Sequence, residues 1–194
     1  MAPAPERAGT LFAVVGPSGA GKDSVIGFAR QAFSDDRRVL FVRRTISRPA
    51  DGESEDHEPA TAQAFLRQAD AGAFCVTWQA HGLHYGLPRA ALAHVERGGV
   101  AIANGSRKAM EAVFERFPRV QLIEIVATSD VIAKRLAVRG RETEADIAAR
   151  LKRSVDAYHG AADAITLDNS GPLSVAGDAF VRLVRRRLET GPAA

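Results

Sequence analysis

The stretch "GPSGAGKDS", from Gly16 to Ser24, constrains the fold of this chain more than any other feature. An apolar run, Thr10–Val15, precedes it and predicts a buried strand, and the apolar residues that follow it recur with helical spacing. The pattern G-x-x-x-x-G-K between a strand and a helix is typical of a phosphate-binding loop, whose glycines let backbone N–H groups face a phosphate. We expect a nucleotide to contact Gly16, Pro17, Ser18, Gly19, Ala20, Gly21, Lys22, Asp23 and Ser24.

The residue after the loop lysine is Asp23, where such a loop usually has a Ser or Thr whose hydroxyl ligates Mg²⁺. A hydroxyl follows one position later, at Ser24. A carboxylate is also a good oxygen ligand for Mg²⁺, but its charge beside phosphates must be offset by the metal or by arginines. Two interpretations stay open: Asp23 or Ser24 ligates the metal, or Asp23 only stabilises the first helical turn.

The remaining chain alternates apolar segments with helical ones. We expect strands at 38–42, 99–104, 120–126 and 164–167, and a strand pair within 73–86 that turns near Gly82. Helices are expected at 61–72, 106–117 and 129–138, and from Pro88, Thr143 and Pro172. Residues 48–59 are acidic and rich in breakers, which predicts a functional loop. Apolar strands that alternate with helices predict an α/β fold, with a parallel sheet flanked by helices on both faces.

Composition narrows the class of protein. The chain has 194 residues, 46% of them hydrophobic, which is enough for one substantial core and predicts a single domain. No apolar run approaches the roughly 18 residues of a membrane span, and the N-terminus lacks a signal-peptide pattern, so we expect a cytoplasmic protein. The lone Cys75 lies between Phe74 and Val76, which predicts a buried, inert thiol.

The charge pattern does not favour a nucleic-acid partner. The pI is near 9.4, but acidic residues interrupt the arginines and no aromatic residues are interleaved with them. We therefore expect a small-molecule substrate, with no nucleic acid and no membrane as partners. The oligomeric state stays open, a homodimer included.

From "VVGPSGAGKDSV" onward, the chain resembles the guanylate kinase group of P-loop kinases. The segment "RLAVRGRETEADIAARLKRS" is similar to the Arg-rich lid of that group, and "ITLDNSGPLSVAGDAF" to its last strand and helix. The resemblance implies a P-loop NTPase fold with ATP as donor, Arg135 and Asn169 at the nucleotide, and Lys22, Arg139 and Arg150 as catalytic residues. It divides the single domain, 1–194, into a core (about 10–42 and 99–188), an acceptor-binding region (about 43–98), a lid (about 137–150) and two tails (1–9 and 189–194).

Three departures argue against guanylate as the acceptor. Val76 stands where guanylate kinases have a Glu that holds guanine, and a site without its hydrogen-bonding group loses discrimination. His57 stands where a Tyr that contacts the acceptor phosphate is expected, and Asn104 where an acidic residue is expected after the third core strand.

The combination of "GPSGAGKDS", "RRTISRP", "HGLHYGLP", "ANGSR" and "RGRE" resembles the ribose 1,5-bisphosphate phosphokinase family. In that family an Asp after the loop lysine is usual. The resemblance implies transfer of the γ-phosphate of ATP, with Mg²⁺, to ribose 1,5-bisphosphate in bacterial phosphonate breakdown. Arg44 and Arg48 are expected to bind one phosphate, and Trp78 is assigned to packing. The other residues expected to read ribose hydroxyls or to orient those arginines are Glu53, Asp56, His81, His84 and Tyr85.

Two alternatives stay open at this point. One is a kinase for another small acceptor, guanylate included. The other is a non-catalytic P-loop module that binds nucleotide, although such modules tend to lose the lysine and lid arginines that this chain keeps as Lys22, Arg139 and Arg150.

Overall fold

The computed structural model of the chain describes residues 8–49, 56–138 and 163–190. Its main element is a parallel sheet in the strand order β2-β7-β1-β8-β9. The strands are β1 (Thr10–Val15), β2 (Val39–Val42), β7 (Val100–Asn104), β8 (Val120–Val126) and β9 (Ile165–Asp168). All four pairings are parallel, which confirms the α/β class predicted from the apolar strands.

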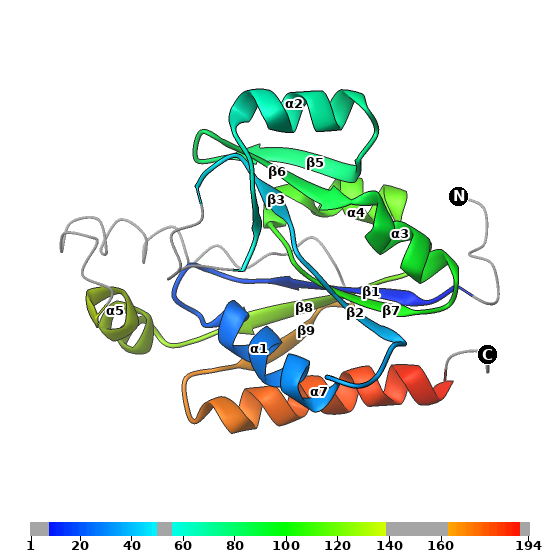
Figure 1. Ribbon diagram of the computed structural model, residues 1–194. Coiled ribbons are helices and arrows are strands. Elements are labelled where there is room, and N and C mark those ends of the chain that lie inside the picture. The colour runs from blue at the N-terminus through cyan, green and yellow to red at the C-terminus, as the bar shows by residue number, and fades with distance from the viewer. Residues whose placement is uncertain (1–7, 50–55, 139–162, 191–194) are drawn as a thin grey trace.

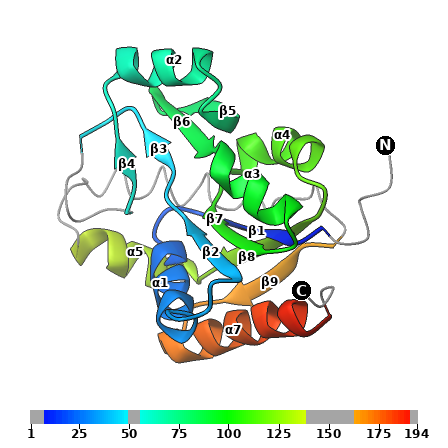
Figure 2. The same ribbon diagram turned by 45° about the vertical axis from the view of Figure 1, so that its right-hand side comes forward.

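Helices cover both faces of this sheet (Figures 1 and 2). The helices α1 (Lys22–Ala32) and α7 (Leu173–Thr190) pack on the face that receives Phe12 and Val14 of β1. The helices α3 (Arg89–Glu96) and α4 (Met110–Arg116) pack on the face that receives Leu11, Ala13 and Val15. Successive side chains of a strand point to opposite faces, so the apolar run of β1 serves both cores. The helix α5 (Ser129–Val138) follows β8.

The segment expected at 106–117 is not one continuous helix. A short 3₁₀ turn, η1 (Arg107–Ala109), precedes α4. The helix expected from Thr143, the lid and both tails lie wholly or largely outside the described residues.

A second, four-stranded sheet in the order β4-β3-β6-β5 lies above the first in Figures 1 and 2. The predicted strand pair forms β5 (Phe74–Ala80) and β6 (Leu83–Pro88). Its turn contains His81 and Gly82, with φ of 52° and 72°, which suits the tight connection of a hairpin. The sequence did not predict β3 (Thr45–Ile46) and β4 (Glu58–Pro59), because two residues are too few to show a pattern.

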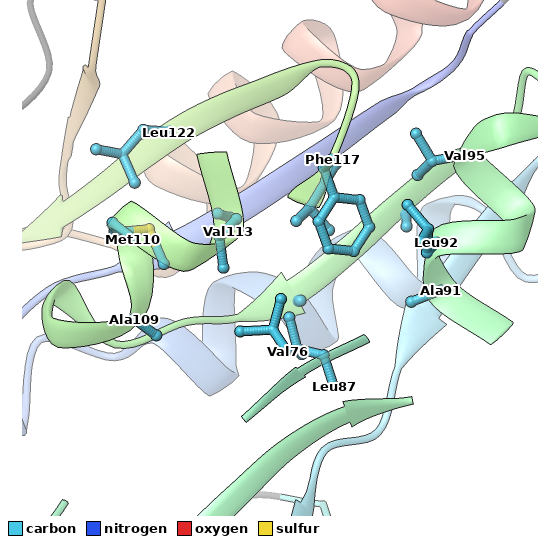
Figure 3. Packing of buried hydrophobic residues seen from close by; sticks show 14 of the residues in the cluster. Val76, Leu87, Ala91, Leu92, Val95, Ala109, Met110, Val113, Phe117 and Leu122 are labelled. Carbon is cyan, nitrogen blue, oxygen red and sulfur yellow. The ribbon is translucent and has the colours of Figure 1, made fainter. Parts of the chain in front are cut away.

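Buried side chains join the small sheet to the large one. Val76 of β5 and Leu87 of β6 are paired residues that point into the core beneath α3 and α4, as Figure 3 shows. On its other face the small sheet carries α2 (Ala62–Asp70), whose Phe65 stacks on Phe74 with ring centroids 4.7 Å apart. The small sheet is thus held between a shared core and its own helix.

Candidate active site

The glycine-rich loop between β1 and α1 has the backbone that the sequence predicts. Gly16, Gly19 and Gly21 have φ of 145°, 87° and 88°, values that side-chain-bearing residues rarely adopt. The Lys22 ammonium donates to the carbonyl oxygens of Gly16 at 2.9 Å and Pro17 at 3.1 Å. The loop therefore wraps around the lysine at the start of α1.

Two residues predicted to bind nucleotide contact this loop. The buried Asn169 donates from Nδ2 to the Ala20 carbonyl at 2.8 Å. Arg135 of α5 donates from Nη1 to the same carbonyl at 3.2 Å and from Nη2 to the Asn169 carbonyl at 2.9 Å. Arg135 and Asn169 thus join the loop to α5 and to the end of β9, and their contact with nucleotide stays a prediction.

A cavity of about 470 Å³ opens beside the loop. It brings the predicted loop residues Gly16, Ser18, Lys22 and Asp23 together with Arg44, Arg48, His81 and Tyr85 of the predicted acceptor region. The remaining residues around it are Trp78, Ala80, Asn104, Gly105, Ser106, Arg107 and Lys108. Segments that lie far apart in the sequence therefore share one site.

Asp23 and Ser24 have different positions relative to this cavity. Asp23 lines it, and its Oδ1 accepts a hydrogen bond from Nδ2 of Asn104 at 2.7 Å. Ser24 is exposed on α1 and is not among the lining residues. Asn104 ends β7 beside Val14 of β1, so the carboxylate at this corner comes from α1 and not from the end of β7.

The donor set suits a magnesium ion that is held mainly by substrate. Within residues 8–49, 56–138 and 163–190, no three His, Cys, Asp or Glu side chains cluster as metal ligands. Asp23 is the one carboxylate among the described residues that line the cavity. Mg²⁺ commonly binds one or two carboxylates together with substrate phosphates, so Asp23 beside the phosphate loop fits it.

The side of the cavity that belongs to the predicted acceptor region contains a pair of aromatic rings. Trp78 and Tyr85 are cross-strand partners in β5 and β6, and their rings stack with centroids 5.3 Å apart. The buried Arg44 guanidinium lies 5.5 Å and 5.4 Å from the two ring centroids, within range for cation–π attraction. Trp78 packs against the core, as the sequence predicts, but it also lines the cavity.

Two predicted acceptor residues are not brought to the cavity. His84 lies on the opposite face of β6 from Tyr85, with its ring 5.4 Å from that of Phe65. Neighbouring residues of a strand cannot both face one site, so the alternation decides between them. Asp56 instead pairs with Arg43 at 2.8 Å. Glu53, Arg139 and Arg150 lie outside the described residues.

The sequence missed the cationic residues Arg107 and Lys108, which follow β7 and line the cavity. Arg107 donates from Nη2 to Oε1 of Glu124 at 2.8 Å. A signal for them existed, since ligands bind at the carboxyl ends of parallel strands. Cys75 belongs to β5 of the small sheet and is half-buried against the core, where burial raises the pKa of its thiol, consistent with an inert side chain.

Curated relatives decide the family. A protein of Agrobacterium fabrum named ribose 1,5-bisphosphate phosphokinase PhnN is 44% identical over 176 residues, which cover 91% of this chain and 96% of that protein. A protein of the same name from Brucella melitensis is 44% identical over 173 residues, covering 89% and 90%. The chain belongs to the ribose 1,5-bisphosphate phosphokinase family. No family model matches the chain.

Solved structures agree with this membership at the level of the fold. The guanylate kinase of Anaplasma phagocytophilum superposes with a TM-score of 0.67 at 17% identity, covering 97% of this chain and 89% of that one. The fold predicted from the resemblance is thereby confirmed. Among the described helices of this family member, none has the length and apolarity to cross a bilayer.

Proposed function

We propose that this chain transfers the γ-phosphoryl group of ATP to the 1-phosphate of ribose 1,5-bisphosphate, giving 5-phosphoribosyl 1-diphosphate and ADP. Family membership supports this activity, and one structural observation carries it for this chain. The phosphate loop with Lys22 and the acceptor-region arginines Arg44 and Arg48 line the same cavity. A donor phosphate on the loop and an acceptor beside those arginines would therefore meet.

The charges around the cavity suit a polyanionic acceptor. The described lining carries five cationic side chains and a single carboxylate, that of Asp23. The cations are Lys22, Arg44, Arg48, Arg107 and Lys108. Clustered like charges raise the local potential and attract a ligand of opposite sign. A sugar with a phosphate at each end matches this excess.

The reaction needs positioning more than proton transfer. An oxygen of the acceptor 1-phosphate forms a bond to the γ-phosphorus while the bond from that phosphorus to the ADP oxygen breaks. A phosphate oxygen is already ionised at neutral pH, so no general base has to remove a proton. The chain's contribution is to align the two phosphates and offset their charge, which the backbone of the loop and Lys22 do.

Asp23 is the residue that would hold Mg²⁺, and the ion, when bound, neutralises charge on the phosphate oxygens. The same proposal assigns Arg139 and Arg150 of the lid to the transferred group. Both arginines lie outside the described residues. Because Asp23 brings a negative charge next to phosphates, we expect activity to depend strongly on the metal.

Guanylate is a less favourable acceptor for this site. Val76 stands where the resemblance places a guanine-binding carboxylate, yet its side chain is only 5% exposed and packs in the core. The position is therefore covered by the core and does not line the cavity. A non-catalytic role is also less favourable, because Lys22 stands at the end of a fully formed phosphate loop.

An assay with ATP, Mg²⁺ and either ribose 1,5-bisphosphate or GMP tests the proposal, with 5-phosphoribosyl 1-diphosphate and GDP measured separately. We expect turnover of the ribose substrate alone. Lys22→Ala should abolish transfer and leave the thermal unfolding transition in place. Comparable or faster turnover of GMP would overturn the proposal, as would wild-type turnover by the Lys22 variant.

A further inference from the structure

We propose that Arg107 and Lys108 form a second phosphate-binding pole in the cavity and that this pole holds the reacting 1-phosphate of the acceptor. Arg44 and Arg48, on the other sheet, then hold the 5-phosphate. This inference rests on the proposed function and names residues that bind the substrate at the same site. The term "second pole" below means Arg107 and Lys108.

The position of the second pole beside the phosphate loop supports this assignment. Arg107 begins η1, three residues after Asn104 ends β7. The strand β7 runs parallel to β1, with Asn104 opposite Val14, and the Gly105 N–H donates to the Val14 carbonyl at 2.7 Å. The loop starts two residues after Val14, so the second pole follows the strand next to the one that carries the loop. An acceptor phosphate held at this junction would lie next to a γ-phosphate bound to the loop.

An ion pair across the end of β1 holds Arg107. Its partner Glu124 lies on β8, which pairs with the opposite edge of β1, and Glu124 stands in register with Val15. The Arg107 and Glu124 side chains are only 24% and 9% exposed, so water screens the pair weakly. A guanidinium keeps further N–H donors when one nitrogen binds a carboxylate. Arg107 is therefore oriented before any ligand binds.

The two sets of cations come from separate sheets. Arg44 precedes β3 and Arg48 follows it in the small sheet, whereas the second pole follows β7 of the large sheet. A sugar phosphate carries about −1.5 to −2 charges on each phosphate at neutral pH. One cationic set can satisfy a monophosphate, but a bisphosphate needs both. The excess of cations is thus explained by an acceptor with two separated phosphates.

Calorimetric titration with two ligands, in the absence of ATP, separates the poles. Ribose 1,5-bisphosphate carries both phosphates, and ribose 5-phosphate lacks the 1-phosphate. Lys108→Met removes the charge and keeps the length of the side chain. We expect it to weaken binding of ribose 1,5-bisphosphate about tenfold, as for loss of a charge-assisted hydrogen bond, and to change binding of ribose 5-phosphate less than about twofold.

Two variants serve as controls. Arg48→Ala should weaken both ligands, because both carry the 5-phosphate. Arg67→Met removes a cation from the exposed side of α2, outside the cavity, and should change neither affinity.

A double variant tests the other residue of the second pole. Arg107→Met would leave the buried Glu124 without its partner, so Arg107→Gln is combined with Glu124→Gln. This double variant should show the same selective loss as Lys108→Met.

Equal weakening of both ligands by the Lys108 variant would overturn the assignment to the 1-phosphate. If both the Lys108 variant and the double variant bound the two ligands as the wild type does, the second pole would not bind the acceptor. These titrations need no turnover. If the selective loss is seen but no 5-phosphoribosyl 1-diphosphate forms in the wild-type assay, the proposed function fails and the second pole stands. If product forms and the selective loss is absent, the second pole alone fails.

Discussion

Asn104, at the end of β7, has an amide side chain where the resemblance to guanylate kinases predicts a carboxylate. Asn104 donates to Asp23 at 2.7 Å, and Asn104 itself is only 7% exposed. Two carboxylates at this distance would repel each other, since like charges raise the pKa of one member of the pair. The amide thus permits a carboxylate on α1 beside the phosphate loop. The residue after the loop lysine and the residue that ends β7 have to be considered together.

Asn104→Asp places a second carboxylate against Asp23 and should destabilise the fold as the pH rises. The folded pair would hold a proton more readily than the unfolded chain, so stability falls between about pH 4 and the raised pKa. We expect the free energy of unfolding of the variant to be lower at pH 7 than at pH 4 by about 1 kcal/mol more than in the wild type, allowing for the exposure of Asp23. Urea denaturation in EDTA at the two pH values measures this difference.

The double variant Asp23→Asn with Asn104→Asp is the matched control. It restores one carboxylate and one amide, and its pH dependence should return to that of the wild type. A loss of stability in Asn104→Asp that is the same at both pH values would contradict the repulsion between Asp23 and the new carboxylate.

At the scale of elements, the phosphate loop depends on partners that arrive late in the chain. The Ala20 carbonyl accepts hydrogen bonds from Asn169, which follows β9, and from Arg135 of α5. Gly21, the last residue before α1, lies directly against this junction, because a Cβ there would collide with Nδ2 of Asn169. A glycine is therefore required here for two reasons: the backbone has a positive φ, and Asn169 leaves no room for a Cβ.

Gly21→Ala should impair the loop while leaving the sheet intact. A residue with a side chain at φ of 88° is strained by about 1–3 kcal/mol, and the collision with Asn169 shifts the loop backbone. We expect ATP affinity to fall at least about tenfold in calorimetric titration, since misplaced backbone N–H groups no longer converge on the phosphates.

Gly27→Ala offers a control within the same helix. A Cβ at Gly27 has nothing within 4 Å, and Ala is favoured over Gly inside a helix by about 0.5–1 kcal/mol. This variant should be slightly more stable and bind ATP normally. If the two variants bound ATP equally well, the close packing of Gly21 against Asn169 would have no functional role.

At the scale of the whole molecule, the site exists because a small sheet is fastened to a large one. Val76 and Leu87 enter the core of the large sheet (Figure 3). Trp78 and Tyr85, two residues away on the same faces of their strands, line the cavity. One face of the hairpin thus changes from core to cavity lining along its length. We therefore expect stability and acceptor binding to be coupled through these two strands.

Val76→Glu tests this arrangement. If the position faced the acceptor, a carboxylate there could read guanine; in the structure it is 5% exposed within an apolar cluster. We expect the free energy of unfolding, measured by urea denaturation, to fall by about 3 kcal/mol or more, because a buried charge has no partner there. We also expect no turnover of GMP. Val175→Glu, at a position 62% exposed on α7, should change stability by less than about 0.5 kcal/mol. A stable Val76 variant that phosphorylates GMP would show that this position faces the acceptor.

Local sequence patterns were enough to predict several parts of the structure. The strand-loop-helix around Lys22, the parallel order of apolar strands and the hairpin near Gly82 follow from spacing, glycine conformation and burial, which act over a few residues. The family followed from motifs quoted along the chain.

Other features depended on contacts between distant segments. Only the tertiary structure turned His84 away from the cavity while Tyr85 lines it, and only it brought Arg107 to Glu124 and Asn104 to Asp23. Strand alternation is visible in a sequence, but which face meets a ligand depends on what packs against the other face. The sequence by itself determined which chemical groups this protein has for phosphoryl transfer. The packing of one sheet on the other decided which of them share a cavity, because that choice depends on contacts between segments as far apart in the sequence as Asp23 and Asn104.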